Sequence, residues 1–264
     1  MCFPKIFYFF IFLFSSLSLV SQNGDKASEK DLISSLNWKK WSPDVVPVFT
    51  PAESLAQFKV APGFKVELVA SEPMIKDPVF VDWDDAGRMW VGELRTYMRD
   101  LDGTGENERM SRVMVLEDTD QDGVMDKATP FVDDMINVRC IAFVDGGVLV
   151  VETGGLWFCK DIDGDLRCDE RKKLIDFATA AQSNIEHAEN ALHFALDNWM
   201  YNSKSSRKLA WRKGKLIEMP AKGRGQWGMA SDAFGRLYFN ANSNWFEVDW
   251  ATYDRQWPSK GSSV

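Results

Sequence analysis

Basic residues are fewer than acidic ones in this sequence, and long helical patterns are scarce. The 264 residues include 31 Lys and Arg against 39 Asp and Glu, a formal net charge of −8. A negative chain has no general attraction to nucleic acid, so we expect no nucleic-acid partner. No Cys-x-x-Cys-His motif occurs, which excludes an attached c-type haem in this chain. Short strands linked by turns, without helices between them, exclude a doubly wound α/β fold.

The one long apolar run lies at the N-terminus, after the basic segment MCFPK. It reads IFYFFIFLFSSLSLV over residues 6–20 and is followed by the small and polar residues SQNGD. The run is short for a helix that crosses a bilayer, although a retained anchor is the alternative. The pattern predicts a signal peptide over residues 1–22, removed near Ser21–Asn23. We therefore expect a periplasmic or secreted protein with no transmembrane span in the mature chain.

The stretch after the signal peptide predicts a flexible leader over residues 23–49 and then a short helix. In TPAESLAQF, Thr50 lies at the N-cap, Pro51 at N1 and Glu53 at N3. These are the elements of a capping box, which starts a helix.

Cysteine is also sparse, with four in the chain, of which Cys2 would leave with the signal peptide. Export allows disulfides to form. Cys159 and Cys168 flank an acidic loop, where a bridge would hold two strands together; a reduced pair is the alternative. Cys140 would then be a single buried thiol.

Four segments share one plan: an apolar strand, a tight turn of Asp with Gly or Asn, and a second strand rich in aromatic and β-branched residues. They are FVDWDDAGRMWVGE, IAFVDGGVLVVE, LHFALDNWMYNS and GMASDAFGRLYFNA, with equivalent positions at Trp90, Leu149, Tyr201 and Tyr238. The spacings of 59, 52 and 37 residues are near the length of a propeller blade. The sequence therefore predicts an all-β fold, a partial β-propeller over residues 50–264, with a β-sandwich as the alternative. A six-bladed ring needs about two further blades of about 40–50 residues, so we expect a piece of a longer protein.

Two short segments, DTDQDGVMD and DIDGDLRCD, concentrate aspartates at one spacing. Carboxylates at positions 1, 3, 5 and 9 and a backbone carbonyl at position 7 suit calcium. Neither loop is an EF-hand, because position 12 holds Thr129 or Lys172 in place of Glu, and Leu166 stands where the first loop has Gly123. We predict a structural calcium ion in each loop; a polar turn without metal is the alternative. The predicted ligands are Asp118, Asp120, Asp122, Val124 and Asp126 in the first loop and Asp161, Asp163, Asp165, Arg167 and Asp169 in the second.

Polar side chains also follow corresponding strands of several units. His187, one of only two histidines, precedes the third unit, beside Glu186, Glu189 and Asn190. Loops of neighbouring blades meet at a propeller axis, so these positions predict a shared ligand site. A packed structural histidine is the alternative, and His193, inside the strand, is expected to pack. The other polar residues of the predicted site are Glu93, Arg95 and Tyr97 after the first unit and Asn240, Asn242 and Asn244 after the fourth.

Several ordered motifs resemble a known family. TPAESLAQFKVAPGFKVELVASEPMIKDPV, GRMWVGELRTY, RVMVLEDTDQDGVMDK, GGVLVVETGGLWFCKDIDGD and FGRLYFNANSNW are similar to the N-terminal propeller of the large membrane-bound dehydrogenases common in planctomycetes. The likeness covers about residues 50–250. Those proteins resemble the soluble glucose/sorbosone dehydrogenases, six-bladed propellers that use pyrroloquinoline quinone (PQQ) and calcium.

The resemblance implies a dehydrogenase that oxidises a sugar or related alcohol and passes electrons to a cytochrome c. His187, Leu192, Asp197 and Tyr201 keep the offsets of that family's histidine motif, which implies that His187 is the general base. In the glucose/sorbosone dehydrogenases a Gly-Arg pair follows the histidine, and this sequence has Asn190-Ala191 in its place. The cofactor site implied for PQQ includes Glu93, Arg95, Tyr97, Asn190 and Asn242.

Two other functions fit the same sequence. A calcium-dependent lactonase would hold an axial metal through Glu93, Asn190 and Asn242. A non-catalytic propeller, stiffened by calcium, would bind a glycan or a protein.

Overall fold

The computed structural model describes residues 48–100, 102–177 and 185–249, all within the compact unit formed by residues 43–264. The predicted signal peptide, most of the leader and the C-terminal segment lie outside the described residues. The capping-box helix is confirmed as α3 (Pro51–Ala56), where the Thr50 hydroxyl accepts from the Glu53 N–H at 3.3 Å and the Glu53 carboxylate accepts from the Thr50 N–H at 2.8 Å. None of the helices in the described part of the chain has the length and apolarity needed to cross a bilayer.

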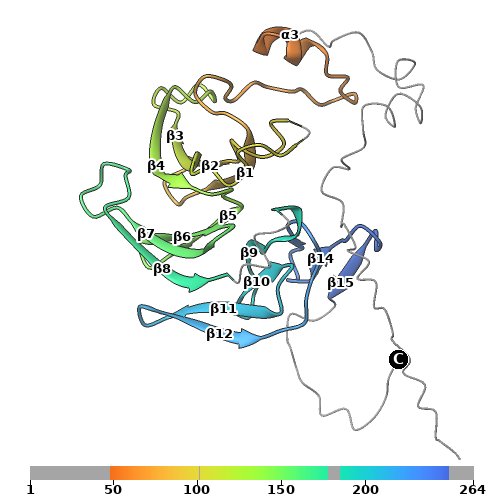
Figure 1. The fold of residues 1–264 in the computed structure, drawn as a ribbon. Coiled ribbons are helices and arrows are strands. Elements are labelled where there is room, and N and C mark those ends of the chain that lie inside the picture. Colours follow the sequence, from red (N-terminus) through yellow and green to blue (C-terminus); the bar gives the residue numbers. More distant parts are fainter. Residues whose placement is uncertain (1–47, 101, 178–184, 250–264) are drawn as a thin grey trace, which may run out of the picture. The chain divides into compact units, whose positions relative to one another are not determined.

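The strands form four antiparallel sheets, each built from consecutive strands (Figure 1). No described sheet takes strands from distant parts of the chain, as a sandwich would require. Sheets that follow one another in this way are propeller blades, and the predicted β-propeller is confirmed. The blades are β1 (Pro78–Trp83), β2 (Met89–Glu93), β3 (Ser111–Glu117) and β4 (Lys127–Met135); β5 (Cys140–Val144), β6 (Gly147–Glu152), β7 (Gly155–Lys160) and β8 (Glu170–Asp176); β9 (Asn190–Phe194), β10 (Met200–Ser203), β11 (Arg207–Arg212) and β12 (Lys215–Pro220); and β13 (Ala230–Ser231), β14 (Leu237–Phe239) and β15 (Glu247–Asp249).

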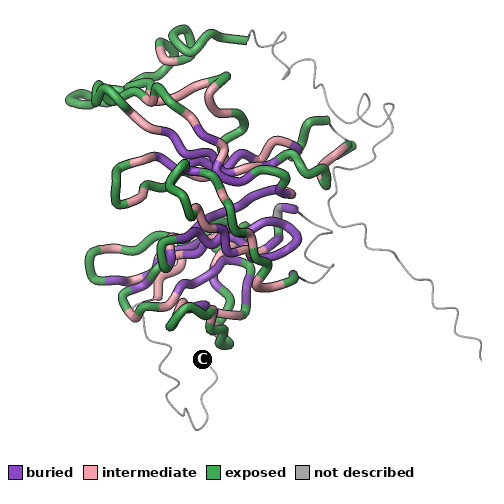
Figure 2. The backbone as a smooth tube through the Cα atoms, turned by 90° about the vertical axis from the view of Figure 1, so that its left-hand side faces the viewer, coloured by how far each residue is buried: buried purple, intermediate pink, exposed green. Residues whose placement is uncertain are grey.

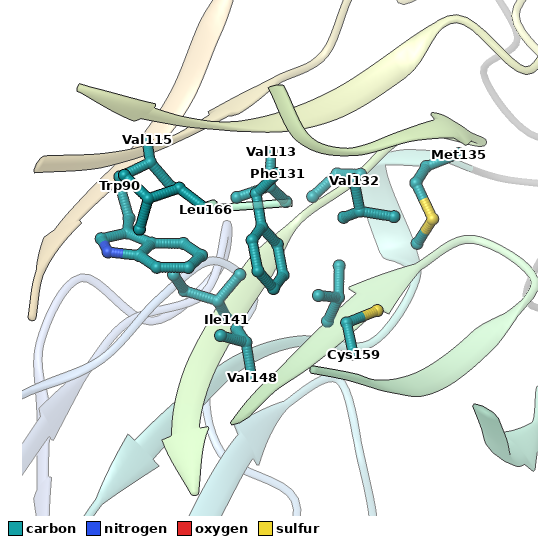
Figure 3. Close-up of a cluster of buried hydrophobic side chains, with 12 residues drawn as sticks. Trp90, Val113, Val115, Phe131, Val132, Met135, Ile141, Val148, Cys159 and Leu166 are labelled. Atoms are coloured by element: carbon teal, nitrogen blue, oxygen red, sulfur yellow. The ribbon is translucent and has the colours of Figure 1, made fainter. Parts of the chain in front are cut away.

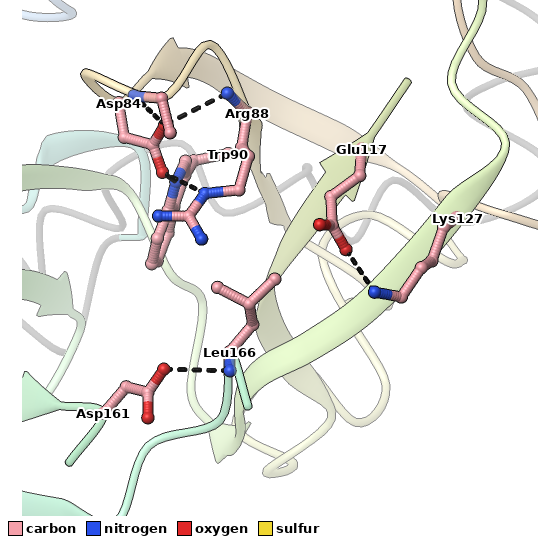
Figure 4. A network of polar contacts seen from close by, with 8 residues as sticks. Asp84, Arg88, Trp90, Glu117, Lys127, Asp161 and Leu166 are labelled. Carbon is pink, nitrogen blue, oxygen red and sulfur yellow. Dashed lines mark hydrogen bonds and ion pairs between the residues drawn. The ribbon is translucent and has the colours of Figure 1, made fainter. Parts of the chain in front are cut away.

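The repeated turn between the first two strands of a blade is held by its aspartate. Asp84 Oδ2 accepts from Trp90 Nε1 at 2.9 Å and from Arg88 Nε at 2.7 Å (Figure 4). The same bond joins Asp197 to the Tyr201 hydroxyl at 2.8 Å and Asp232 to the Tyr238 hydroxyl at 2.9 Å in the third and fourth blades. The aromatic residue of the repeat therefore has two functions, because its ring packs in the blade and its polar tip closes the turn.

The second blade departs from this pattern because Leu149 has no polar tip. Its turn aspartate, Asp145, instead accepts from Trp211 Nε1 of β11 at 3.1 Å, so the bond crosses to the third blade.

The core consists of apolar layers between neighbouring blades, and Figure 2 shows buried residues gathered along the strands and exposed ones along the connecting loops. Strand β6 shows why the segment VLVV is apolar throughout. Side chains alternate along a strand, so Val148 and Val150 pack in the cluster with the first blade, whereas Leu149 and Val151 pack in the cluster with the third (Figure 3). Each fully buried side chain of this kind contributes about 1.5–3 kcal/mol.

Candidate functional site

The two acidic loops occupy equivalent places in successive blades. Loop 118–126 joins β3 to β4, and loop 161–169 joins β7 to β8. Their hydrogen bonds match: the position-1 carboxylates of Asp118 and Asp161 each accept from the position-6 backbone N–H, at 2.9 Å in both loops. The position-9 carboxylates likewise accept from the position-2 N–H, at 3.0 Å for Asp126 and 2.7 Å for Asp169.

Each loop draws three carboxylates together. Oxygens from Asp118, Asp120 and Asp126 lie within 4.8 Å of one another, and so do oxygens from Asp161, Asp163 and Asp169. Asp122 and Asp165 lie outside these groups and accept from the N–H of Val124 and Arg167, both at 2.8 Å. The structure therefore brings together six of the eight aspartates predicted to bind metal.

Leu166 takes a backbone conformation that normally favours glycine. Its φ is 66°, against 92° for Gly123 at the same position of the first loop. A left-handed conformation costs a non-glycine residue about 1–2 kcal/mol. The side chain is buried among the core residues between the first two blades, so its packing offsets this strain (Figure 3).

The thiols beside the second loop are free in the structure. Cys159 is buried and Cys168 is partly buried. A hydrogen bond from the Cys159 thiol lowers the pKa of Cys168 to about 7, and the same bond raises the pKa of Cys159. The two thiols are therefore adjacent, and the bridge between them stays a prediction.

The strand register places the acidic loops at one end of the hairpins. Glu117 pairs with Lys127 at the start of the first loop, and Leu116 pairs with Met89, next to the β1–β2 turn. Glu93, at the far end of β2, pairs with Arg112. The loops therefore lie at the opposite end of the blade from Glu93 and the polar residues that follow it.

At that opposite end, the Glu93 carboxylate is fully buried and engaged within the protein. Its Oε2 accepts from Arg112 Nε at 2.5 Å and lies 3.7 Å from Arg95 Nε, and its Oε1 accepts from the Lys76 N–H at 2.8 Å. Two hydrogen-bond donors and the positive charges of Arg112 and Arg95 stabilise the buried carboxylate. In the second blade Glu152 has a similar place, accepting from the Ile136 N–H and from Trp157 Nε1 at 2.8 and 2.7 Å.

A pocket of about 670 Å³ lies beside this end, between the first and fourth blades. Tyr97, which follows β2, lines it together with Asp77, Gln226, Trp227 and Asn242. The structure thus brings together Tyr97 and Asn242, two residues of the predicted axial site that are far apart in the sequence.

Asn190 lies behind the pocket and is almost fully buried. Its amide nitrogen donates to the Ala188 and Gln226 carbonyls at 3.1 and 2.7 Å, and its oxygen accepts from the Gly228 N–H at 2.9 Å. These bonds fix the backbone on both sides of Trp227. Asn190 therefore shapes the pocket, with its own polar atoms bonded to the protein.

The two histidines lie in different surroundings, and neither is among the residues that line the pocket. His187 ends the 3₁₀ helix Ile185–His187, directly before β9, and its side chain is exposed. His193 lies within β9 opposite Tyr201, with its Nε2 atom buried and without a hydrogen-bond partner. Burial lowers the pKa of His193.

Sequence reasoning missed Trp227, which lines the pocket, and Arg139, which lies against its ring. Arg139 Cζ lies 5.5 Å from the centroid of the Trp227 ring. In the sequence, Arg139 is the single charged residue within the largely apolar run INVRCIAFV. Because arginine is rarely buried without a partner, this position could have been identified as unusual.

Comparisons with solved structures find partial matches of low identity. One is assigned as a gluconolactonase, at 12% identity and a TM-score of 0.49, with 69% of this chain and 61% of that chain covered. A gluconolactonase from Xanthomonas campestris matches at 13% identity and a TM-score of 0.44, over 66% of this chain and 57% of that one. The PQQ domain of a pyranose dehydrogenase from Coprinopsis cinerea matches at 12% identity and a TM-score of 0.41. The match covers 68% of this chain and 46% of that one. The chain spans between 46% and 61% of the length of these proteins, and similarity at this level indicates nothing about its activity.

No curated protein matches the sequence. A family described as a domain of unknown function, DUF7133, matches residues 50–262, and the chain therefore belongs to that family.

Proposed function

We propose that the chain is the propeller of an exported, quinone-dependent dehydrogenase that oxidises a sugar or related alcohol. The observation that carries the proposal is the pocket where Tyr97 of the first blade meets Gln226, Trp227 and Asn242 of the fourth. Amide and carboxylate groups bind hydroxyls, and aromatic faces bind the apolar face of a sugar ring. The family resemblance supports the choice of a dehydrogenase over other sugar-binding proteins.

Calcium in the two acidic loops would stiffen the blades without entering the reaction. Three carboxylates within 4.8 Å of one another, with a carbonyl two positions before the last, fit a hard cation that prefers oxygen ligands. Without an ion, these charges would repel one another at short range. The loops lie at the end of the blade away from the pocket, which supports a structural role.

The same pocket has side chains that suit the planar ring of PQQ, but none of its lining residues is a cation that would pair with the three carboxylates of the quinone. The rings of Tyr97 and Trp227 offer faces for a planar quinone, and the amides of Gln226 and Asn242 offer donors to its oxygens. When bound, the quinone would supply the acceptor for the hydride of the substrate alcohol.

His187 would take the proton of the substrate hydroxyl. Its exposed ring is free of the packing that holds His193, and it stands three residues before Asn190, whose amide holds the backbone of Gln226 at the pocket. An unprotonated imidazole near neutral pH is suited to this step.

The lactonase alternative is less well supported by the contacts. Glu93 is bonded to Arg112 and to the Lys76 N–H, and both polar atoms of the Asn190 side chain are bonded to backbone groups. Only Asn242 of the three ligands that a lactonase metal would need is exposed at the pocket.

The proposal is tested by binding and turnover together. The complete protein, with the further blades expected from the sequence, is incubated with calcium and PQQ, and sugar-dependent dye reduction and calorimetric binding of the sugar are measured. We expect His187→Gln to reduce turnover by about 10²–10⁴-fold with sugar binding retained, whereas Trp227→Ala should weaken binding. The matched control is His193→Gln, which should change stability before turnover. Equal turnover in wild type and His187→Gln would contradict the role of His187 as general base. Lactone hydrolysis without quinone would favour the lactonase over the dehydrogenase.

A further inference from the structure

Arg139 is a buried cation that has no carboxylate partner among the residues the structure describes. It directly precedes β5, and its side chain is 2% exposed. Its Nη2 donates to the Thr153 hydroxyl at 3.2 Å, but Nε and Nη1 are buried and have no hydrogen-bond partner. Desolvation lowers the pKa of Arg139 to about 10, which reflects the lack of a compensating negative charge.

Apart from Arg171, the other partly or fully buried arginines of the described chain have such partners. Arg112 pairs with Glu93 at 2.5 Å, Arg207 pairs with Glu189 at 2.9 Å, and Arg224 pairs with Asp249. Burying an unpaired charge is unfavourable, and buried guanidinium groups are normally paired and hydrogen-bonded. Arg139 therefore costs stability in the ligand-free protein, which suggests that its partner comes from outside the chain.

The surroundings of Arg139 indicate which pocket that partner would occupy. Its guanidinium stacks on Trp227 with 5.5 Å between Cζ and the ring centroid, and Trp227 is 39% exposed and lines the pocket. Tyr97, on the same pocket, is close enough to affect the charge of Arg139. The guanidinium thus lies against a ring that lines the pocket, and a ligand reaches it only if the Trp227 indole moves.

We propose that Arg139 binds the carboxylate of a sugar acid, and that the substrate of the pocket is a polyhydroxylated carboxylate rather than a neutral sugar. This inference rests on the proposed function, because it uses the same pocket. Nε and Nη1 donate from different edges of the guanidinium, so the carboxylate would accept at the end of the group, from Nη1 and from the second N–H of Nη2, a pairing that a lysine cannot reproduce. The hydroxyls would be bound by Asp77, Gln226 and Asn242, which line the rest of the pocket.

The test compares D-gluconate with D-glucose, which lacks the carboxylate and closes into a ring; D-glucitol, open-chain like gluconate but uncharged, controls for the ring. Binding of each is measured by calorimetry and by the shift in melting temperature, at constant ionic strength. We expect gluconate to bind at least about tenfold more tightly than glucose, as a hydrogen-bonded charge pair predicts. Arg139→Met should weaken gluconate binding by about 10–100-fold and change glucose binding less than threefold.

Stability of the free protein provides a second measurement. If Arg139 serves a ligand, Arg139→Met without ligand should melt at the same temperature as wild type or higher, because the unpaired charge is gone. Arg139→Lys keeps the charge without the planar fork, and it should bind gluconate more weakly than wild type even if the Met variant folds poorly.

Arg171→Met is the matched control. The Arg171 guanidinium lies over Trp157 at 4.3 Å and also has unpartnered buried nitrogens, but it lies next to the second acidic loop. It should leave gluconate binding unchanged.

Three results would overturn the inference. If gluconate and glucose bind equally, the sugar pocket stands and the carboxylate assignment fails. If neither binds, both the inference and the proposed function fail. Stabilisation by PQQ alone, lost in the Arg139 variants, would assign the residue to the carboxylates of the quinone and exclude the sugar acid.

Discussion

Asn190 Oδ1 accepts a hydrogen bond from the Gly228 N–H at 2.9 Å, and this contact ties the third blade to the segment that leads into the fourth. With its amide nitrogen also bound to the Gln226 carbonyl, one buried side chain holds three residues of the pocket wall. The pocket therefore depends on contacts between blades as well as on the strands themselves.

Replacing Asn190 with Ala should lower the free energy of unfolding by about 2–4 kcal/mol, because buried backbone groups would lose their partners. Urea denaturation measures this change. Asn242→Ala is the control, since Asn242 is exposed at the same pocket and its replacement should change stability by less than about 0.5 kcal/mol. Equal losses in the two variants would show that the Asn190 bonds are not needed for the fold.

Removing calcium should destabilise the protein. At a concentration one hundred times the dissociation constant, one bound ion adds about 2.7 kcal/mol, so a chelator should lower the melting temperature by about 5–10 °C. Asp120→Ala and Asp163→Ala should each remove part of this effect and together abolish it. Asp85→Ala, an exposed aspartate of the β1–β2 turn, should keep the full chelator effect. Identical melting curves with and without chelator would exclude calcium.

Leu166→Gly and Gln121→Gly separate backbone strain from packing. Both positions have a left-handed φ, 66° and 63°. Gln121 is exposed, so glycine relieves strain of about 1–2 kcal/mol against an added chain entropy of about 0.5–1 kcal/mol, and stability should rise slightly. Leu166 is buried, and losing its side chain should outweigh the relief, with a net loss of about 1–3 kcal/mol. Chemical denaturation measures both, and a gain at Leu166 would contradict its packing role.

His193 should make stability depend on pH. Because burial lowers its folded pKa below the usual 6.5, the unfolded chain binds a proton more readily. The stability contribution is complete above pH 6.5 and falls as the pH drops below that value. Melting curves between pH 5 and 7.5 should show this decline, and His193→Gln should reduce it while His187→Gln leaves it in place.

The cysteines should differ in reactivity. Cys168, with its pKa lowered to about 7 by the bond from Cys159, should be alkylated first at neutral pH, as thiolates are the reactive form. Cys140 should remain unmodified until unfolding, because burial raises its pKa. Mass spectrometry after timed iodoacetamide treatment gives the order. Cys159→Ser tests whether the neighbouring thiol is the cause, since a reduced rate at Cys168 is then expected.

The sequence by itself determined the features whose contacts are local. The helix cap at Thr50 and Glu53, the turns closed by Asp84 and Asp232, and the matching acidic loops all join residues within about ten positions of each other. Short-range hydrogen bonds require particular residue types at particular spacings, so they are visible as repeated letters. The repeat of strand, turn and strand then predicted a propeller.

Only the tertiary structure decided which of the polar residues line the pocket. Tyr97 and Asn242 meet at one pocket, whereas Asn190 and Glu93, equally polar in the sequence, are buried and bonded within the protein. Asp145 has the same turn sequence as its equivalents but bonds to the next blade. Whether a charge such as Arg139 is paired depends on desolvation and on neighbours brought together from distant segments, and no spacing along the chain encodes that.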